Sequence, residues 1–243
     1  MKNILLIDIS NSFTKTCLVV GDSISRVKRL PTPSLDAAQI LALYPSRQIE
    51  AVVLSSVVPS KNPVIHAAFA RVLEVGAALD LGVGIDYPSP RSIGADRLAN
   101  AAACAALHGF PGIVVDFGTA VTFDVISQAG DYIGGVIAPG LNAMTSYLHD
   151  RTALLPNIKL REPSSAVGRS TRDAMLSGAV HGYRGLLKEI LAQIRSEAFP
   201  KKRPCIIATG GDAELISGRV GLFDIVDPLL TLRGLLVIAQ RNL

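Results

Sequence analysis

The sequence predicts an α/β protein built from two copies of a small domain. The first observation is a repeated pattern, in which an apolar run ends in an aspartate and a turn of small residues leads into a second β-prone run. One copy places this aspartate at Asp8 and the other at Asp116. The second observation is size and composition, because 243 residues that are 49% hydrophobic and 18% charged can form two small domains with a substantial core.

The first half of the chain is expected to alternate strands and helices. Short apolar or β-branched runs predict strands over residues 4–9, 16–20, 24–30 and 51–57. Helical patterns occur over residues 35–43, 62–73 and 94–107. Ser34 is expected to cap the first of these helices, and Pro63 to open the second.

The second half repeats this alternation. Strands are expected over residues 112–117, 121–126, 132–137, 206–208 and 224–226, and helices over 141–148, 170–198 and 230–242. Ser170 and Asp173 have the spacing of a capping box. Gly109, Pro111 and Gly112 interrupt the chain between the halves, so we expect domains at 1–109 and 110–243. The alternative is two unrelated strands that both end in aspartate, but the shared order of strand, aspartate, turn and strand favours duplication.

Charge and cysteine usage exclude several classes of protein. The net charge of +4 comes from scattered basic residues, and the cluster 201–203 lies between prolines like a solvated loop, so no nucleic-acid partner is expected. No run approaches the roughly 20 apolar residues of a membrane span, so no membrane partner is expected. Cys17, Cys104 and Cys205 lie far apart without metal-binding spacing, which favours a soluble protein of a reducing cytoplasm.

The two turns after the aspartates suggest phosphate binding. Residues 10–12 (Ser-Asn-Ser) and 118–120 (Gly-Thr-Ala) are small enough to bring backbone N–H groups close to a triphosphate. Asp8 and Asp116 would offer carboxylates to a cation that bridges the phosphates. Two such hairpins facing each other across a cleft predict a nucleotide site and a phosphotransferase. Either turn alone reads equally as an ordinary turn cap.

Two further groups are candidates for the remaining parts of such a site. Gly210 and Gly211 follow a buried strand and would let a base or ribose lie against the backbone, although a simple helix-entry turn explains them equally well. Asp96 lies in the first turn of a helix, where the dipole and Arg97 would stabilise its anion. It would orient an alcohol and accept its proton late in phosphoryl transfer. The alternative is a helix N-terminal carboxylate without a chemical role.

Known motifs narrow the choice of enzyme. The chain has neither the Walker A pattern of P-loop kinases nor the G-x-S-x-G elbow of α/β-hydrolases. Over nearly its whole length it instead resembles the type III pantothenate kinases, bacterial members of the acetate and sugar kinase/Hsp70/actin superfamily. The most specific matching segments are Gly94–Arg97, Asp116–Asp124, Gly134–Gly140, Gly168–Thr171 and Ala208–Gly211.

This resemblance implies a fold of duplicated ribonuclease H-like domains, as in actin-like ATPases. It also implies ATP-dependent phosphorylation of the 4′-hydroxyl of pantothenate, the first committed step to coenzyme A, with Mg²⁺ and a monovalent cation, K⁺ or NH₄⁺. The positions matched to ATP contacts are Asp8, Ile9, Ser10, Asn11, Ser12, Phe13, Thr14, Lys15, Thr119, Gly210 and Gly211. Those matched to pantothenate are Tyr87, Gly94, Ala95, Asp96, Arg97 and Thr171. Asp96 matches the catalytic base, Asp116 the monovalent-cation ligand, and Asp8 a ligand of Mg²⁺ directly or through water.

The family resemblance further implies a homodimer, and the small residues Gly178, Ala179 and Gly182 would suit its interface. One position departs from the family pattern, which usually reads Asp-x-Gly-Asn-Thr where this chain has Ser10 for the glycine and Ser12 for the threonine. A Cβ at Ser10 is unfavourable if the backbone needs positive φ or lies close to phosphate. There are two alternatives to phosphorylation of pantothenate. One is a regulatory role without catalysis, and the other is phosphorylation of another small molecule.

Overall fold

The computed structural model describes residues 3–21, 23–218 and 220–243, which form two compact units. The first unit contains the chain up to Gly109 together with Gly130–Ile133 and Leu229–Leu243. The second contains Phe110–Ala129 and Gly134–Pro228. The sequence alone assigned everything after residue 109 to the second lobe, whereas the C-terminal helix packs within the first unit.

The first unit is built on a sheet with the order β3-β2-β1-β5-β6, in which β4 also pairs with β2. Its strands are β1 (Asn3–Ile9), β2 (Phe13–Val20), β3 (Ser23–Ile24), β4 (Lys28–Pro31), β5 (Ala51–Ser56) and β6 (Val72–Glu74). The strand β1 is antiparallel to β2 and parallel to β5, and β5 is parallel to β6. The continuous apolar run of β5 is buried on both faces, as expected for a central parallel strand.

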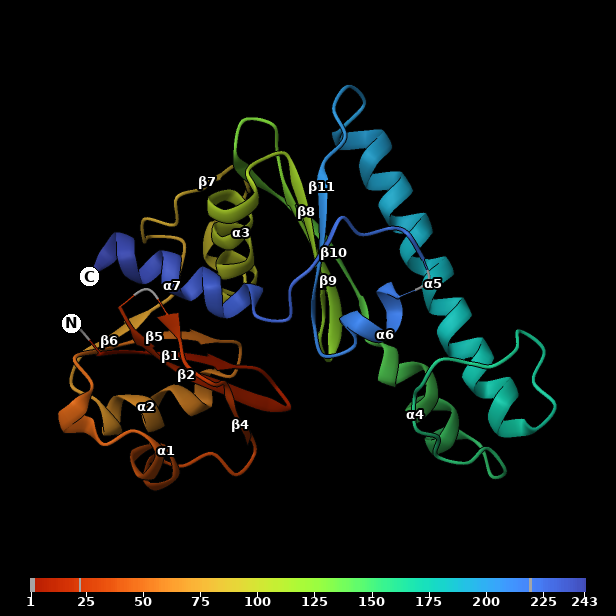
Figure 1. The fold of residues 1–243 in the computed structure, drawn as a ribbon, viewed down its shortest axis with the longest axis horizontal. Coiled ribbons are helices and arrows are strands. Elements are labelled where there is room, and N and C mark those ends of the chain that lie inside the picture. The colour runs from red at the N-terminus through yellow and green to blue at the C-terminus, as the bar shows by residue number, and fades with distance from the viewer. Residues whose placement is uncertain (1–2, 22, 219) are drawn as a thin grey trace. The chain divides into compact units, whose positions relative to one another are not determined.

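Helices cover both faces of this sheet (Figure 1). The helices α1 (Ala37–Leu43) and α2 (Asn62–Ala68) lie on one face, where Ile40 and Ile65 join a core with Leu5, Ile7 and Leu54. The helices α3 (Ala95–His108) and α7 (Leu230–Asn242) lie on the other face and contact β5. This arrangement fixes the start of α3, which carries Asp96, against the sheet that carries Asp8.

The helices α3 and α7 are packed closely enough for their backbones to touch. A Cβ on Gly234 of α7 would lie 1.9 Å from the carbonyl oxygen of Ala99 on α3, which leaves room for glycine alone. Beside this contact, the buried hydroxyl of Thr231 donates to the side-chain oxygen of Asn100 at 2.9 Å. The alanine-rich face of α3 is therefore what allows α7 to approach.

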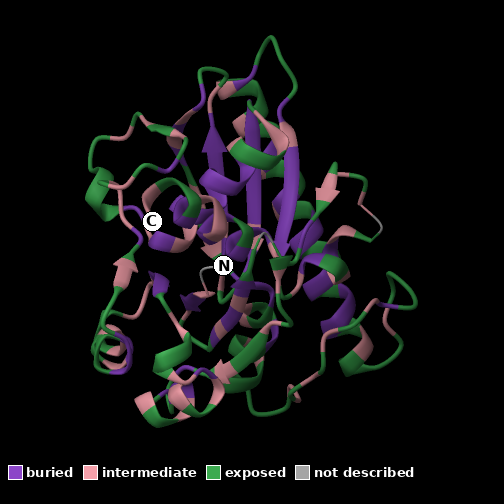
Figure 2. Ribbon diagram, turned by 60° about the vertical axis from the view of Figure 1, so that its left-hand side comes forward, coloured by how far each residue is buried: buried purple, intermediate pink, exposed green. Residues whose placement is uncertain are grey.

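The second sheet has the order β12-β11-β8-β9-β10-β7. Its strands are β8 (Gly112–Phe117), β9 (Ala120–Ile126), β10 (Asp131–Pro139), β11 (Cys205–Gly210), β12 (Ile225–Val226) and β7 (Gly84–Ile85). The buried residues follow β8 and β9 over most of their length (Figure 2). β10 begins in the first unit, where Asp131 and Tyr132 pair with β7, and continues in the second.

The second unit also contains α4 (Leu141–Arg151), α5 (Thr171–Ala198) and α6 (Ala213–Ser217). The helix α5 begins as expected, because the Ser170 hydroxyl accepts from the Asp173 backbone N–H at 3.1 Å. The ring of Tyr183 on α5 packs against Phe117 on β8 with 6.3 Å between centroids. None of the helices among the described residues combines the length and apolar character that crossing a membrane requires.

The two units share one strand topology, which supports the predicted duplication. In each, a hairpin of antiparallel strands (β1 with β2, β8 with β9) is followed by two parallel strands on the same side (β5 and β6, β11 and β12). In the matching registers Asp8 pairs with Ser55, and Asp116 pairs with Thr209. The repeated aspartates therefore occupy equivalent positions of the two sheets.

Three local predictions were wrong. The single strand predicted over residues 24–30 is divided into β3 and β4, and residues 25–27 belong to neither. The cap of α1 is Asp36, whose carboxylate accepts from the Gln39 N–H at 2.8 Å, and not Ser34. The helix predicted over residues 62–73 ends at Ala68, and residues 72–74 instead form β6 beside β5. Pairing with the buried strand β5 overrides the helical pattern at these residues. As part of β6, Val72 pairs with Val52, a contact that the end of a helix would not provide.

Candidate functional site

The first aspartate is held by two hydroxyl groups. Asp8 is the penultimate residue of β1 and is 2% exposed. The buried Ser55 hydroxyl donates to its Oδ1 at 3.0 Å, and the Ser10 hydroxyl contacts its Oδ2 at 3.4 Å. A buried carboxylate is costly without such donors, so Ser55 and Ser10 help to keep Asp8 in one orientation. The sequence reasoning missed Ser55, since only the β1–β5 pairing brings it to Asp8.

The turn that follows Asp8 is tied down by one threonine. The Thr32 hydroxyl donates to the Ser10 carbonyl at 2.7 Å, and the Thr32 N–H donates to the Ser12 carbonyl at 3.1 Å. Asn11, Ser12 and Phe13 are exposed, whereas Lys15 is half-buried. Ile9 and Thr14 are fully buried, so neither residue is accessible to a ligand in this structure.

Ser10 occupies this turn without backbone strain. Among the described residues, positive φ occurs only at glycines, so Ser10 does not need the conformation that a glycine would favour. Gly118, at the matching position of the second turn, has no positive φ either. Ser10 therefore does not strain the backbone. Crowding of a bound phosphate by its Cβ is still a prediction.

Replacing Ser10 with Gly is expected to lower the free energy of unfolding by about 0.5–1 kcal/mol, because the serine is unstrained and glycine adds freedom to the unfolded chain. Urea denaturation measures this change. The KM for ATP, measured on the same variant, would fall if the Ser10 Cβ crowds the phosphates. A gain in stability would contradict the unstrained turn.

The second aspartate lies where three turns meet within the second unit. A Cβ on Gly210, whose φ is +94°, would lie 2.6 Å from Asp116 Oδ1 and 2.6 Å from the Phe117 backbone. The Gly211 N–H donates to the Phe117 carbonyl at 2.9 Å. Only glycine fits at position 210, so the glycine pair and Asp116 of the sequence prediction are in direct proximity.

The third turn brings the start of α4 to Thr119. The Gly140 N–H donates to the Thr119 carbonyl at 3.1 Å, and a Cβ on Gly140 would lie 2.4 Å from that oxygen. Thr119 itself is an exposed residue. This close contact explains why residue 140, the last of the matching segment 134–140, is a glycine. The sequence alone assigned this glycine no role.

Asp212 is a further acidic group at these turns that the sequence reasoning did not assign. Burial raises its pKa above the ordinary aspartate value, and the Asn142 amide donates to its Oδ2 at 3.4 Å. This bond joins the start of α4 to the start of α6. Asp212 therefore borders the same turns as Thr119 and the glycine pair.

The acceptor-side residues gather at the start of α3 in the first unit. Asp96 Oδ1 accepts from the Arg97 backbone N–H at 2.8 Å, and a Cβ on Gly94 would lie 2.6 Å from the same oxygen. A helix N-terminus stabilises the carboxylate anion. Gly94 is thus required for the position that the Asp96 side chain adopts.

A buried tyrosine connects the other acceptor-side candidates. The ring of Tyr132, which is 0% exposed, lies 5.7 Å from the Arg97 guanidinium and 6.0 Å, edge-on, from the ring of Tyr87. Such a cation–π contact orients the arginine. Tyr132 therefore brings Tyr87 close to Arg97 and its neighbour Asp96. The sequence did not point to Tyr132 itself, because only the pairing of β10 with β7 places it beside these residues.

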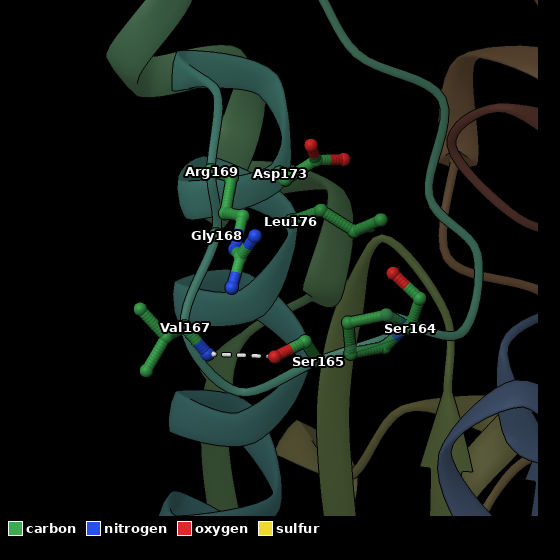
Figure 3. Close-up of a pocket in the computed structure, with 8 residues that line it drawn as sticks. Ser164, Ser165, Val167, Gly168, Arg169, Asp173 and Leu176 are labelled. Atoms are coloured by element: carbon green, nitrogen blue, oxygen red, sulfur yellow. Dashed lines mark hydrogen bonds between the residues drawn. The ribbon is translucent and has the colours of Figure 1, made fainter.

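Thr171 is the exposed first residue of α5. Residues that precede and follow it along the chain, among them Arg169 and Asp173, line a hollow of about 190 Å³ (Figure 3). The hollow is lined by a loop and by the first turns of α5, through Pro163, Ser164, Ser165, Val167, Gly168, Arg169, Asp173 and Leu176. A Cβ on Gly168 would lie 2.2 Å from the Ala174 nitrogen, so the loop rests directly on the helix backbone. The second unit thus contributes a polar and apolar hollow at the start of α5.

The donor groups fit cations that bind with few protein ligands. Among the described residues no three His, Cys, Asp or Glu side chains form a metal cluster. Mg²⁺ in nucleotide sites commonly takes one or two carboxylates and completes its shell with phosphate oxygens and water. The Asp8 carboxylate with the Ser10 hydroxyl suits such a cation, and the Asp116 carboxylate offers oxygen to a second one.

The fold defines the class of protein. An archaeal actin homolog superposes with a TM-score of 0.54 over 99% of this chain and 100% of its own, at 13% identity. A Campylobacter jejuni protein assigned to the Baf family of transcriptional activators superposes with a TM-score of 0.65 over 97% of both chains, at 23% identity. The chain therefore has the duplicated ribonuclease H-like fold of actin-like ATPases and sugar kinases.

Sequence similarity identifies the family within this class. The type III pantothenate kinase family model matches residues 4–193. A type III pantothenate kinase of Akkermansia muciniphila is 48% identical over 98% of this chain and 99% of its own length. One of Methylacidiphilum infernorum is 42% identical over 97% of this chain and 88% of its own. The chain belongs to the type III pantothenate kinase family.

Proposed function

We propose that the protein transfers the γ-phosphoryl group of ATP to the 4′-hydroxyl of pantothenate, which gives 4′-phosphopantothenate in the first step of coenzyme A biosynthesis. Membership of the type III pantothenate kinase family is the observation that carries this proposal. The kinase activity requires ATP with a divalent metal, since the phosphates must be neutralised for transfer. The local surroundings of Asp8 and Asp96 in the first unit, and separately those of Asp116 in the second, support it.

Each unit contributes to ATP binding in this proposal. In the first unit, residues 8–15 approach the phosphates, with Asp8 as the ligand of Mg²⁺, directly or through water. In the second unit, Thr119 contacts the phosphates and Gly210 and Gly211 lie against the nucleoside. Asp116 holds K⁺ or NH₄⁺. When bound, the cations neutralise phosphate charge, while the protein groups fix the phosphates by hydrogen bonds from backbone and hydroxyl donors.

Asp96 acts on the acceptor alcohol. Its carboxylate orients the 4′-hydroxyl and takes the hydroxyl proton as the new P–O bond forms, while the bond from the γ-phosphorus to its leaving oxygen breaks. Gly94, Ala95, Arg97, Tyr87 and Thr171 hold pantothenate. The Arg97 guanidinium, fixed over Tyr132, suits the carboxylate of this substrate.

We also propose a cytoplasmic homodimer without nucleic-acid or membrane partners. Gly178 and Gly182 are exposed on α5, so this side of the helix is available for close approach by a second copy. Ala179, in contrast, is 5% exposed and packs within its own chain. The described cysteines are free thiols, as a reducing compartment would keep them.

A coupled assay of ADP release tests the proposed reaction. With ATP, Mg²⁺ and K⁺ present, ADP release is expected to depend on pantothenate, and replacing K⁺ with Na⁺ is expected to reduce the rate sharply. Mass spectrometry of the product would identify 4′-phosphopantothenate. No pantothenate-dependent turnover under any of these conditions would overturn the proposed function.

A further inference from the structure

A buried arginine in the middle of α5 joins three segments of the second unit. The Arg184 side chain is 8% exposed. Its Nη1 and Nη2 donate to Glu162 Oε1 and Oε2 at 2.9 and 2.8 Å. The same guanidinium donates from Nη2 to the Leu215 carbonyl at 3.0 Å and from Nε to the Ile216 carbonyl at 3.3 Å. One side chain thus binds α5, the loop before it and the end of α6.

Such a group is better suited to fixing geometry than to adding stability. Burying a guanidinium and a carboxylate costs free energy that their attraction only partly offsets, so a well-packed apolar pair often serves stability equally well. The planar fork, however, presents its donors in fixed directions, which a lysine or an apolar side chain cannot reproduce. The last carbonyls of α6 also lack helical partners, and a cation is favoured there.

The segments that Arg184 joins lead to two different parts of the candidate site. The helix α6 starts directly after Gly210, Gly211 and Asp212. The loop that carries Glu162 continues into the hollow at the start of α5, and the Ser177 hydroxyl fastens it a second time by donating to the Ala166 carbonyl at 2.6 Å. A displacement of Arg184 would therefore move two segments together. One is the turn at residues 209–212, assigned to the nucleotide, and the other is the loop at residues 162–171, assigned to pantothenate.

We propose that Arg184 is a positioning residue that couples nucleotide binding to pantothenate binding, by holding the 209–212 turn and the 162–171 loop on the same point of α5. This rests on the proposed function of the two segments. Arg184 itself touches neither substrate in this proposal. Its partner Glu162 acts with it, because an unpaired buried guanidinium would not keep the loop in place.

The test compares Arg184→Met, Arg184→Lys and Glu162→Gln with Arg195→Met, a control at an exposed arginine of the same helix. Steady-state kinetics give KM and kcat for both substrates, and calorimetry gives the Kd of Mg·ADP. Arg184→Met is expected to raise both KM values and this Kd about fivefold or more, with kcat changed less than about threefold. Arg184→Lys and Glu162→Gln should give smaller shifts in the same direction, and Arg195→Met none.

Hydrogen exchange on the full-length variants separates this proposal from the proposed function. In Arg184→Met or the milder Glu162→Gln, protection is expected to fall in both residues 209–217 and residues 162–169. A lower melting temperature with wild-type KM, Kd and exchange would overturn the positioning role. Loss of protection or affinity in one segment alone would overturn the coupling. If the wild-type protein failed to phosphorylate pantothenate, the proposed function would fall, while the exchange result would still decide whether Arg184 joins the segments.

Discussion

Asp96→Asn is expected to lower the pantothenate-dependent kcat by about 100-fold, near the lower end of the range for loss of a general base, because the proton leaves late in phosphoryl transfer. The amide oxygen of asparagine can still accept from the Arg97 N–H, so the start of α3 should keep its structure. Coupled ADP release with and without pantothenate measures the effect, and a thermal melt checks the fold.

The matched control for this variant is Asp36→Asn. Asp36 also accepts a backbone N–H at a helix start, but it is exposed and caps α1. Asparagine is an equally good cap, so stability and turnover should both remain close to wild type. If Asp96→Asn retained most of its turnover, Asp96 would be a structural carboxylate, as the alternative reading of its sequence position holds.

Gly234→Ala is expected to lower the free energy of unfolding by about 3 kcal/mol, the upper end of the usual cost of overpacking. The added methyl would lie 1.9 Å from the Ala99 carbonyl oxygen, so α3 and α7 must separate. Urea denaturation followed by circular dichroism measures the change. A shift of α3 also displaces Asp96, so a lower kcat should accompany the lower stability.

Gly185→Ala provides the control, since it introduces the same methyl into another helix. Gly185 lies on α5, and a Cβ there would meet no atom within 4 Å. Helix propensity then favours alanine by up to about 1 kcal/mol, so this variant should be slightly more stable than wild type. Equal stability of the two variants would show that α3 and α7 do not pack as closely as Gly234 indicates.

Local sequence signals predicted the parts of the fold in which neighbours along the chain decide. The two hairpins, the alanine-rich α3 and the Ser170 cap of α5 depend on residues close in sequence, and the structure contains each of them. The end of α2 and the formation of β6 depend on β5, which lies earlier in the chain and pairs with Val72. A single sequence read by local pattern does not reveal that pairing.

The candidate site divides along the same line. The candidates Asp8 and Asp116 lie near the ends of apolar strands, and Asp96 lies in the first turn of a helix. Such positions can be recognised from the sequence. Ser55, Tyr132 and the pair of Arg184 with Glu162 reach their partners only through strand pairing or through long loops. Their side chains are serine, tyrosine, arginine and glutamate in unremarkable surroundings, so no local signal distinguishes them.

The packing of α7 within the first unit has a consequence for how the protein is made. The chain leaves this unit after Gly109, re-enters it at Gly130–Ile133, and completes it with Leu229–Leu243. During synthesis, α7 is therefore not available to cover the alanine-rich face of α3 until all of the second unit has been synthesised. The first unit therefore cannot be completed before residues 229–243 have been synthesised, after all of the second unit.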